Sequence, residues 1–377
     1  MKKNLIIFGT RPEAIKMAPL VKAFQAESLF QTKVCVTAQH REMLDQVLDF
    51  FDIHPDFDLN LMRKDQNLYT LTAEIITGLK NVMEEFKPDY VYVHGDTTTT
   101  MASSIAAFYA GAKICHVEAG LRTHNKRSPF PEELNRQLTG RMADFHFAPT
   151  DLARKNLLLE NINDDDIVVT GNTVIDALFY STKEVEYVDD EEIMSLKTIV
   201  NHSKKIILVT GHRRENHGQG FINICEALKE IAELNPGVQI IYPVHLNPNV
   251  SKPVYQILSN ISNIHLINPL SYPAFVWLMN YSYLIITDSG GIQEEAPSLG
   301  KPVLVLRDTT ERPEAVEAGT VILVGTDKKK IIKETQNLIV SDELYNRMSA
   351  LHNPYGNGDA CHKIVSFIKG MSQVNVV

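Results

Sequence analysis

The chain has 377 residues, of which 44% are hydrophobic and 22% are charged. These values are ordinary for a globular protein and exclude a disordered chain, a fibrous repeat and a coiled coil. At about 150 residues per domain, the length favours two domains. The formal net charge of -9, from 37 basic and 46 acidic residues, argues against a general nucleic-acid binder or a basic membrane-surface protein. Any anionic ligand must therefore be held by a local group of cations.

The N-terminal segment and the cysteines indicate a cytoplasmic protein. The apolar run at 5–8 is too short for a secretion signal, and no later stretch reaches the roughly 18 apolar residues of a membrane span. The 13 histidines form no metal-binding motif, so we expect no metal. The cysteines are scattered singly, which argues against a disulfide framework or a zinc cluster: Cys35, Cys115, Cys225 and Cys361.

Short β-branched runs alternate with amphipathic segments along most of the chain. Continuous apolar strands separated by helices predict a parallel sheet covered on both faces, which is the doubly wound α/β class. The expected strands of the first half are 5–8, 33–37, 90–93, 113–117, 145–148 and 167–170. Those of the second half are 205–210, 238–244, 263–267, 284–287, 302–306 and 320–323.

An acidic stretch separates two similar α/β halves. Six acidic residues crowd together at 184–192, which is typical of an exposed helix or linker. The strand pattern then restarts, and the turn Thr210-Gly211-His212-Arg213 repeats the character of Phe8-Gly9-Thr10-Arg11. Residues 360–371 are expected to form a closing helix.

The first expected strand ends in a turn that suits an anion. Gly9 permits a tight turn, Thr10 can cap a helix, and Pro12 suits a first helical position. Free N–H groups and Arg11 would then face the anion. An ordinary capped helix fits these residues equally well, and neither a dinucleotide fingerprint nor a P-loop is present.

Carboxylates follow two strands that we expect to be neighbours. Strand 90–93 runs into Asp96, strand 113–117 runs into Glu118, and Glu132 opens a later helix. In open parallel sheets the ligand lies beyond the carboxyl ends of the strands. Several carboxylates brought together there are costly unless they have a function, so this pattern predicts acid/base chemistry.

The second half supplies the complementary positive charge. Strand 205–210 is followed by His212 and Arg213, and strand 284–287 is followed by Asp288-Ser289-Gly290-Gly291. Such a glycine turn at a helix N-terminus can bind phosphate, and His212 with Arg213 opposite it would neutralise a pyrophosphate. The other polar residues at these strand ends are His245, Glu294, Glu295, Arg307 and Arg312. Each turn alone also fits a purely structural role.

Five segments together resemble the non-hydrolysing bacterial UDP-N-acetylglucosamine 2-epimerases, and the similarity runs from residue 5 to about residue 368. The segments are 9–16 (GTRPEAIK), 37–40 (TAQH), 94–99 (HGDTTT), 116–122 (HVEAGLR) and 288–295 (DSGGIQEE). The resemblance implies a glycosyltransferase-B-like fold, with two Rossmann-like doubly wound domains facing across a nucleotide-binding cleft, and usually a homodimer. It places an N-terminal Rossmann-like domain at 1–170, joined by the C-terminal helix 360–377, and a C-terminal UDP-binding domain at 171–359.

The implied reaction is reversible conversion of UDP-GlcNAc to UDP-ManNAc, which supplies ManNAc units for cell-surface polysaccharide. C2 of the sugar is not next to a carbonyl, so its proton cannot be removed by enolisation. Removing it while UDP leaves C1 gives 2-acetamidoglucal instead. Adding UDP back with protonation from the other face inverts C2, and the reaction needs no cofactor.

The resemblance also implies roles for individual residues. The catalytic residues are Asp96, Glu118, Glu132 and His212, of which the three carboxylates act as acid and base and His212 lies near the leaving phosphate. The substrate-binding residues are Arg11, Lys16, Arg213, His245, Ser289, Gly290, Glu295 and Arg312. Some family members bind a second UDP-GlcNAc as activator through a Gln-His pair, here Gln39 and His40. This chain has Glu42 and Asp65 where those members carry Gln and Arg, which leaves activation open.

Three other functions compete with this interpretation. A hydrolysing 2-epimerase would release UDP and free ManNAc, but those enzymes depart from the 12–14 segment found here. A UDP-sugar glycosyltransferase of the same architecture would need an acceptor. A non-catalytic nucleotide-sugar sensor would have no use for three convergent carboxylates.

Overall fold

A computed structural model describes residues 1–37, 41–63 and 66–374, and it divides the chain into two compact units. Unit 1 comprises Met1–Phe179 and Tyr355–Val377, and unit 2 comprises Tyr180–Pro354. Unit 2 is therefore inserted between two parts of unit 1. The domain limits expected from the sequence, after residues 170 and 359, stay a prediction.

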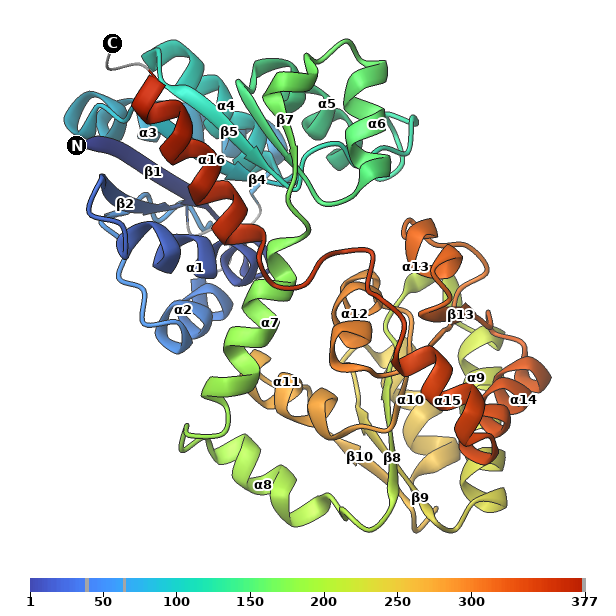
Figure 1. The fold of residues 1–377 in the computed structure, drawn as a ribbon. Helices are drawn as coiled ribbons and strands as arrows, with labels where there is room; N and C mark the ends of the chain where they lie inside the picture. The colour runs from blue at the N-terminus through green and yellow to red at the C-terminus, as the bar shows by residue number, and fades with distance from the viewer. Residues whose placement is uncertain (38–40, 64–65, 375–377) are drawn as a thin grey trace. The chain divides into compact units, whose positions relative to one another are not determined.

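Unit 1 is built on a seven-stranded parallel sheet of order β3-β2-β1-β4-β5-β6-β7 (Figure 1). The strand order reverses between β1 and β4, and ligands of open α/β sheets bind beyond the carboxyl ends of the strands at such a point. The strands are β1 (Lys2–Phe8), β2 (Phe30–Val36), β3 (Phe57–Asp58), β4 (Tyr90–His94), β5 (Lys113–Val117), β6 (Phe145–Ala148) and β7 (Ile167–Val169).

Helices cover both faces of this sheet. On one side α3 packs on α4 and α4 on α5, and on the other α1 packs against α2 and α16. Phe367 of α16 makes edge contacts with Phe145 and Phe147 of β6, at ring-centroid distances of 5.4 and 5.9 Å. The helices are α1 (Arg11–Gln25), α2 (Arg41–Phe50), α3 (Leu68–Phe86), α4 (Thr98–Ala110), α5 (Glu132–Met142), α6 (Asp151–Leu159) and α16 (Ala360–Val374), and the boundary with unit 2 falls within α7 (Thr173–Glu184).

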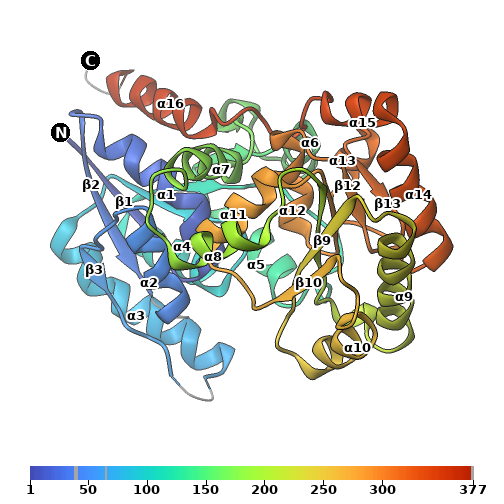
Figure 2. The same ribbon diagram turned by 90° about the horizontal axis from the view of Figure 1, so that it is seen from below.

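Unit 2 is built on a six-stranded parallel sheet of order β10-β9-β8-β11-β12-β13. Its α9 lies between α10 and α14, as Figure 2 shows, and α11 packs on α8. The strands are β8 (Lys205–Thr210), β9 (Val238–Pro243), β10 (Ile264–Ile267), β11 (Leu284–Thr287), β12 (Val303–Val305) and β13 (Val321–Leu323). The helices are α8 (Glu191–Ile199), α9 (Gln219–Leu234), α10 (Pro248–Leu258), α11 (Tyr272–Tyr281), α12 (Gly290–Glu295), α13 (Pro313–Glu317), α14 (Lys328–Val340) and α15 (Asp342–Ser349).

The α/β class predicted from the sequence is confirmed. Expected strands 113–117, 145–148, 205–210 and 284–287 coincide with β5, β6, β8 and β11. Strand β3 was not predicted, because two residues are too few to show a pattern. The acidic stretch separates two helices, and Asp190 caps the second of them.

Because helices cover the sheets, polar as well as apolar side chains of the strands are buried. The four cysteines are buried and free. Within the described ranges, none of the helices combines the length and the apolar character needed to cross a bilayer. Two neighbouring strands also bury His116 and His146, which are paired in the register of β5 and β6.

These buried histidines predict acid sensitivity. Burial lowers the pKa of His116 to about 3 and that of His146 to about 4, so both are neutral in the folded protein at pH 5. In the unfolded chain each has a pKa near 6.5 and binds a proton at pH 5, so stability falls as the pH drops. Urea titrations at pH 7 and pH 5 measure this effect. Between these two pH values, the free energy of unfolding of the wild type should fall by about 2 kcal/mol more than that of His116→Gln.

A second variant controls for local damage at position 116. The same comparison with His146→Gln should give a loss of similar sign. Equal pH dependence of the wild type and both variants would show that neither imidazole is held neutral.

Candidate functional site

The carboxyl end of β1 in unit 1 leads into a turn that only glycine allows. A Cβ on Gly9 would lie 2.1 Å from Thr37 Oγ1 and 2.6 Å from Thr99 Oγ1, which is a clash with both hydroxyls. Helix α1 starts directly after the turn, with Thr10 as its N-cap and Arg11 as its first residue. The predicted cap is therefore confirmed, and it places Arg11 at the carboxyl edge of the sheet.

Glu13 ties this turn to the start of α4. One oxygen accepts hydrogen bonds from the backbone N–H groups of Gly9 (3.1 Å) and Thr10 (2.8 Å). The other accepts from the hydroxyls of Thr97 (2.6 Å) and Thr100 (3.3 Å). The carboxyl is buried, and burial raises its pKa. Sequence analysis gave Glu13 no such role, although Thr10 followed three residues later by Glu is the pattern of a capping box.

Glu118 lies at the centre of a polar cluster beyond β5. Its Oε2 forms an ion pair with Lys16 Nζ, accepts a hydrogen bond from Asn172 Nδ2 (2.8 Å) and lies 3.7 Å from His94 Nε2. Burial lowers the pKa of His94 to about 4, so Lys16 is the cation of this cluster at neutral pH. The backbone of Glu118 is left-handed, with φ 59°, which costs a residue other than glycine roughly 1–2 kcal/mol.

The same edge of the sheet brings Asp96 next to this cluster. A Cβ on Gly95, the residue before Asp96, would lie 3.5 Å from Glu118 Oε1. Asp96 forms an ion pair with Arg136, and its backbone oxygen accepts a hydrogen bond from Asn135 Nδ2 (3.0 Å). Helix α5, which supplies both partners, begins at Glu132. Glu132 and Arg136 are four residues apart and so share one face of the helix.

Two buried groups hold the segment that follows Glu118. Arg122 makes two hydrogen bonds to the Glu160 carboxylate, at 2.6 and 2.8 Å. Glu133 accepts hydrogen bonds from the backbone N–H groups of Thr123 (3.0 Å) and His124 (3.1 Å). Sequence analysis did not predict these contacts, because they join residues 9 to 38 positions apart.

In unit 2 the turn after β8 is fixed from the next strand. Asp288, fully buried at the end of β11, accepts hydrogen bonds through Oδ2 from His212 N (2.9 Å), Arg213 N (2.8 Å) and Asn216 Nδ2 (3.3 Å). The His212 ring stacks on that of His245, with centroids 5.8 Å apart and an interplanar angle of 22°. The predicted set His212, Arg213 and His245 is thus brought together.

Two guanidinium groups flank the start of α12. A Cβ on Gly290 would lie 3.8 Å from Arg312 Nη2 and 3.9 Å from Arg213 Nη2. Ser289 caps this helix in an extended conformation, and its own N–H is bonded to Thr287 Oγ1 (3.0 Å). Backbone N–H groups and two arginines in one place are suited to a phosphate group.

The two glutamates of α12 have different surroundings. Glu294 is buried, and its Oε1 accepts a hydrogen bond from Arg312 Nε (2.6 Å). Glu295 is half-buried, and its Oε1 lies 3.4 Å from the position of a Cβ on Gly291. The ion pair with Arg312 gives Glu294 a structural role, whereas Glu295 is the one of the two that the resemblance implies to be substrate-binding.

Arg307 connects the two loops that carry the arginines. Its Nε donates to Glu215 (2.8 Å), in the loop after Arg213, and its Nη1 and Nη2 donate to Glu311 (2.6 and 3.1 Å), the residue before Arg312. Arg307 is buried, whereas the side chains of Glu215 and Glu311 are 50% and 40% exposed, and the sequence showed only another cation at this strand end.

Two sequence expectations lie outside the described residues. The first is the predicted activator-binding pair, Gln39 and His40. The second concerns Asp65, one of the two residues at which the chain departs from the activator-binding members of the family. Across the described ranges, no three His, Cys, Asp or Glu side chains form a group that could hold a metal ion.

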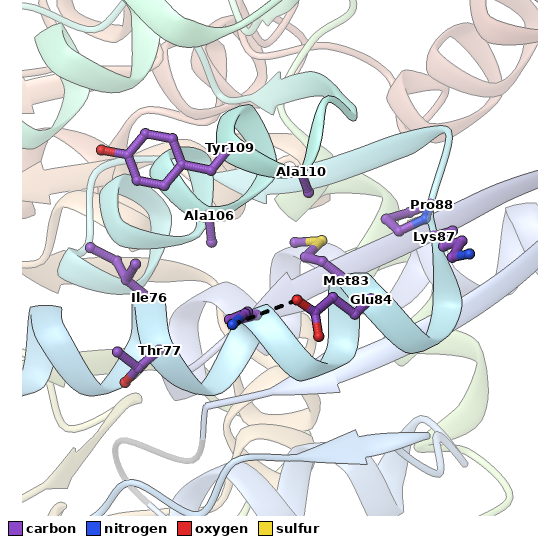
Figure 3. A pocket seen from close by; sticks show the side chains of 10 residues that line it. Ile76, Thr77, Met83, Glu84, Lys87, Pro88, Ala106, Tyr109 and Ala110 are labelled. Atoms are coloured by element: carbon purple, nitrogen blue, oxygen red, sulfur yellow. Dashed lines mark ion pairs between the residues drawn. The ribbon is translucent and has the colours of Figure 1, made fainter.

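A cavity of about 650 Å³ lies between α3 and α4 of unit 1 (Figure 3). It is lined by Ile76, Met83, Ala106 and Tyr109, and the ion pair between Lys80 and Glu84 (3.7 Å) runs along α3 at its edge. It is also lined by residues 87 and 88, which lie in the short connection between α3 and β4. The cavity is therefore at the amino edge of the sheet of unit 1, whereas the polar clusters of this unit lie at its carboxyl edge.

Comparisons with known proteins show the family of the chain and agree with the fold. The profile of the UDP-N-acetylglucosamine 2-epimerase family matches residues 22–369. The UDP-N-acetylglucosamine 2-epimerase of Campylobacter jejuni is 58% identical over 382 residues and covers 100% of both chains. The enzyme of that name from Escherichia coli K12 is 58% identical over 97% of this chain and 98% of its own.

Comparison with a solved structure shows that the similarity extends to the fold. The crystal structure of UDP-GlcNAc 2-epimerase from Neisseria meningitidis bound to UDP-GlcNAc has a TM-score of 0.88 and 52% identity, and the match covers 98% of this chain and 100% of that one. The predicted glycosyltransferase-B-like fold class is confirmed.

The contacts of Glu13 predict a large effect on stability. Glu13→Ala leaves two backbone N–H groups buried without an acceptor, so the free energy of unfolding should fall by about 3 kcal/mol. Glu13→Gln keeps one acceptor oxygen, and the threonine hydroxyls can rotate to accept from its amide, so the loss should be about 1 kcal/mol. Urea denaturation measures both.

Glu84→Gln is the matched control, because the Glu84 side chain is 66% exposed and its ion pair with Lys80 lies on the helix surface. It should change the stability by less than about 0.5 kcal/mol. Wild-type stability of Glu13→Ala would contradict the role given to Glu13.

Proposed function

The chain belongs to the UDP-N-acetylglucosamine 2-epimerase family, and we propose that it converts UDP-GlcNAc to UDP-ManNAc reversibly by the non-hydrolysing route. The observation that carries this proposal is the cluster in which Lys16 and Asn172 hold the Glu118 carboxylate beside the segment of Asp96. Two acidic side chains fixed at one sheet edge are what proton removal and return require.

The chemistry explains why the reaction needs both carboxylates and cations. As a base takes the C2 proton, the C2–H electron pair forms a C1=C2 double bond, and the C1–O bond breaks with its electrons passing to UDP. The products are 2-acetamidoglucal and UDP. In the reverse sense UDP adds to C1, and a proton is delivered to the opposite face of C2. Nothing is oxidised or reduced, so no redox cofactor enters the balance.

We assign the proton transfers to unit 1. Asp96 and Glu118 are the proposed acid and base, with Glu132 as the third carboxylate. The ion pairs to Arg136 and Lys16 support this assignment, because they offset the repulsion between acidic groups held close together. Lys16, expected from the resemblance to bind phosphate, is proposed to orient Glu118 as well.

We assign UDP binding to unit 2. Arg213, Arg312 and the backbone at Ser289 and Gly290 are proposed to bind the diphosphate, and Glu295 is proposed to accept the ribose hydroxyls. The position of both guanidinium groups beside Gly290 supports this assignment. His212 is proposed as the donor to the departing phosphate, where such a donor typically contributes about 3–4 kcal/mol.

The proposal extends to the setting of the reaction. The resemblance of the 12–14 segment to the non-hydrolysing enzymes supports retention of UDP. The family resemblance as a whole supports a homodimer whose product is a ManNAc donor for cell-surface polysaccharide, and we propose that it works in the cytoplasm.

Incubation with UDP-GlcNAc in deuterated water tests the reaction. We expect NMR to show UDP-ManNAc carrying deuterium at C2, and deuterium entering the remaining UDP-GlcNAc, because elimination exposes C2 to solvent protons. Free ManNAc with UDP would instead indicate the hydrolysing reaction. An unchanged sugar would leave a UDP-sugar glycosyltransferase and a non-catalytic sensor as the remaining interpretations.

A variant pair connects the result to the proposed site. Glu118→Gln should slow deuterium entry by about 100-fold or more, since an amide cannot carry the proton. Glu84→Gln removes an exposed carboxylate of the same unit and should exchange at the wild-type rate. Wild-type exchange in Glu118→Gln would refute the role given to Glu118.

A further inference from the structure

The two oxygens of Asp288 have different partners. Oδ2 accepts the three hydrogen bonds that hold the turn after β8, from His212 N, Arg213 N and Asn216 Nδ2. Oδ1 is equally buried and accepts no hydrogen bond from the described residues that meets the distance and angle criteria. Its neighbour is Nδ1 of His212, at an ion-pair distance of 3.3 Å.

Holding the turn does not require a carboxylate. The side-chain oxygen of an asparagine could accept the same three hydrogen bonds at Oδ2, and it would avoid the cost of burying a charge, which amounts to several kcal/mol. The surroundings of its second oxygen give a further reason for an aspartate at this position. A carboxylate has no hydrogen of its own, so it favours a proton on the nearer His212 nitrogen, Nδ1, over one on Nε2.

We propose that Asp288 is a positioning residue that keeps the proton of His212 on Nδ1 and favours the imidazolium, which leaves Nε2–H as a charged donor to the departing diphosphate. This inference rests on the role proposed above for His212. The His212 side chain is 46% exposed, so a ligand can reach the nitrogen that Asp288 does not occupy. Asp288 touches no reacting atom in this scheme and acts only through His212.

The charges around His212 oppose one another. Burial lowers the pKa of His212, the negative charge of Asp288 raises it, and the charges of Arg213 and His245 lower it. Tyr242, from β9, also faces Asp288, and burial keeps its hydroxyl neutral by raising its pKa well above 10. Overall the pKa of His212 is lowered, with burial as the largest cause, and Asp288 is the one of these influences that favours the protonated form.

Asp288→Asn tests the inference, because it retains an oxygen for the turn and presents an amide to His212. With ¹⁵N-labelled histidine in the full chain, and His212→Asn to assign the signal, NMR follows the His212 titration directly. In the wild type we expect the neutral form to carry its proton on Nδ1. In Asp288→Asn the proton should move to Nε2, and the titration midpoint should fall by at least about one pH unit.

Kinetics provide the second readout. With UDP-GlcNAc as substrate, kcat of Asp288→Asn should fall about 10- to 100-fold at neutral pH while KM changes little, because the contact matters most as UDP leaves. The alkaline limb of the pH profile of kcat should move to lower pH by the same amount as the NMR midpoint.

Asn216→Ala is the control for a merely structural role, since it removes one hydrogen bond at Oδ2 and leaves Oδ1 beside His212. Its His212 midpoint should stay near the wild-type value, and an equal shift in both variants would overturn the inference. The inference would also be overturned if neutral His212 of the wild type carried its proton on Nε2, and this measurement needs no variant. If His212→Asn keeps the wild-type kcat, the role proposed for His212 is wrong, whereas the NMR result still decides the Asp288 contact.

Discussion

A buried carboxylate that accepts two consecutive backbone N–H groups organises the first turn of each unit. In unit 1 this is Glu13, bonded to Gly9 and Thr10, and in unit 2 it is Asp288, bonded to His212 and Arg213. The two turns follow β1 and β8, the strands at which each sheet reverses its order. Donors that point at a fixed buried charge cannot turn away, so the side chains of both turns keep a defined direction.

The anchors differ in origin, and this difference matters for function. Glu13 comes from the helix that the turn begins, and its second oxygen bonds to the start of α4 next to Asp96. Asp288 comes from the adjacent strand, and its second oxygen faces a titratable ring. In unit 1 the buried carboxylate of Glu13 thus aligns two helices, whereas in unit 2 the carboxylate of Asp288 places a negative charge beside the His212 ring. A protein with net charge -9 can hold an anion only where such local contacts gather its cations.

The strands and the polar residues at their ends were predictable, whereas the partners of those residues were not. Apolar β-branched runs such as 113–117 determine where strands lie, and Thr10 and Pro12 determine where α1 begins. The bond from Lys16 to Glu118 joins residues 102 positions apart, and that from His212 to Asp288 joins residues 76 apart. No local pattern specifies such pairs, because they depend on how the sheet orders its strands.

The insertion of unit 2 within unit 1 has a consequence for synthesis on the ribosome. All strands of the first sheet emerge before residue 180, but α16, whose Phe367 covers Phe145 and Phe147, emerges only after the whole of unit 2. Part of one face of the first sheet therefore stays uncovered while the 175 residues of unit 2 are translated. The inserted unit is contiguous and can fold during that interval, so the later-made half of the nascent chain is the first that can be finished.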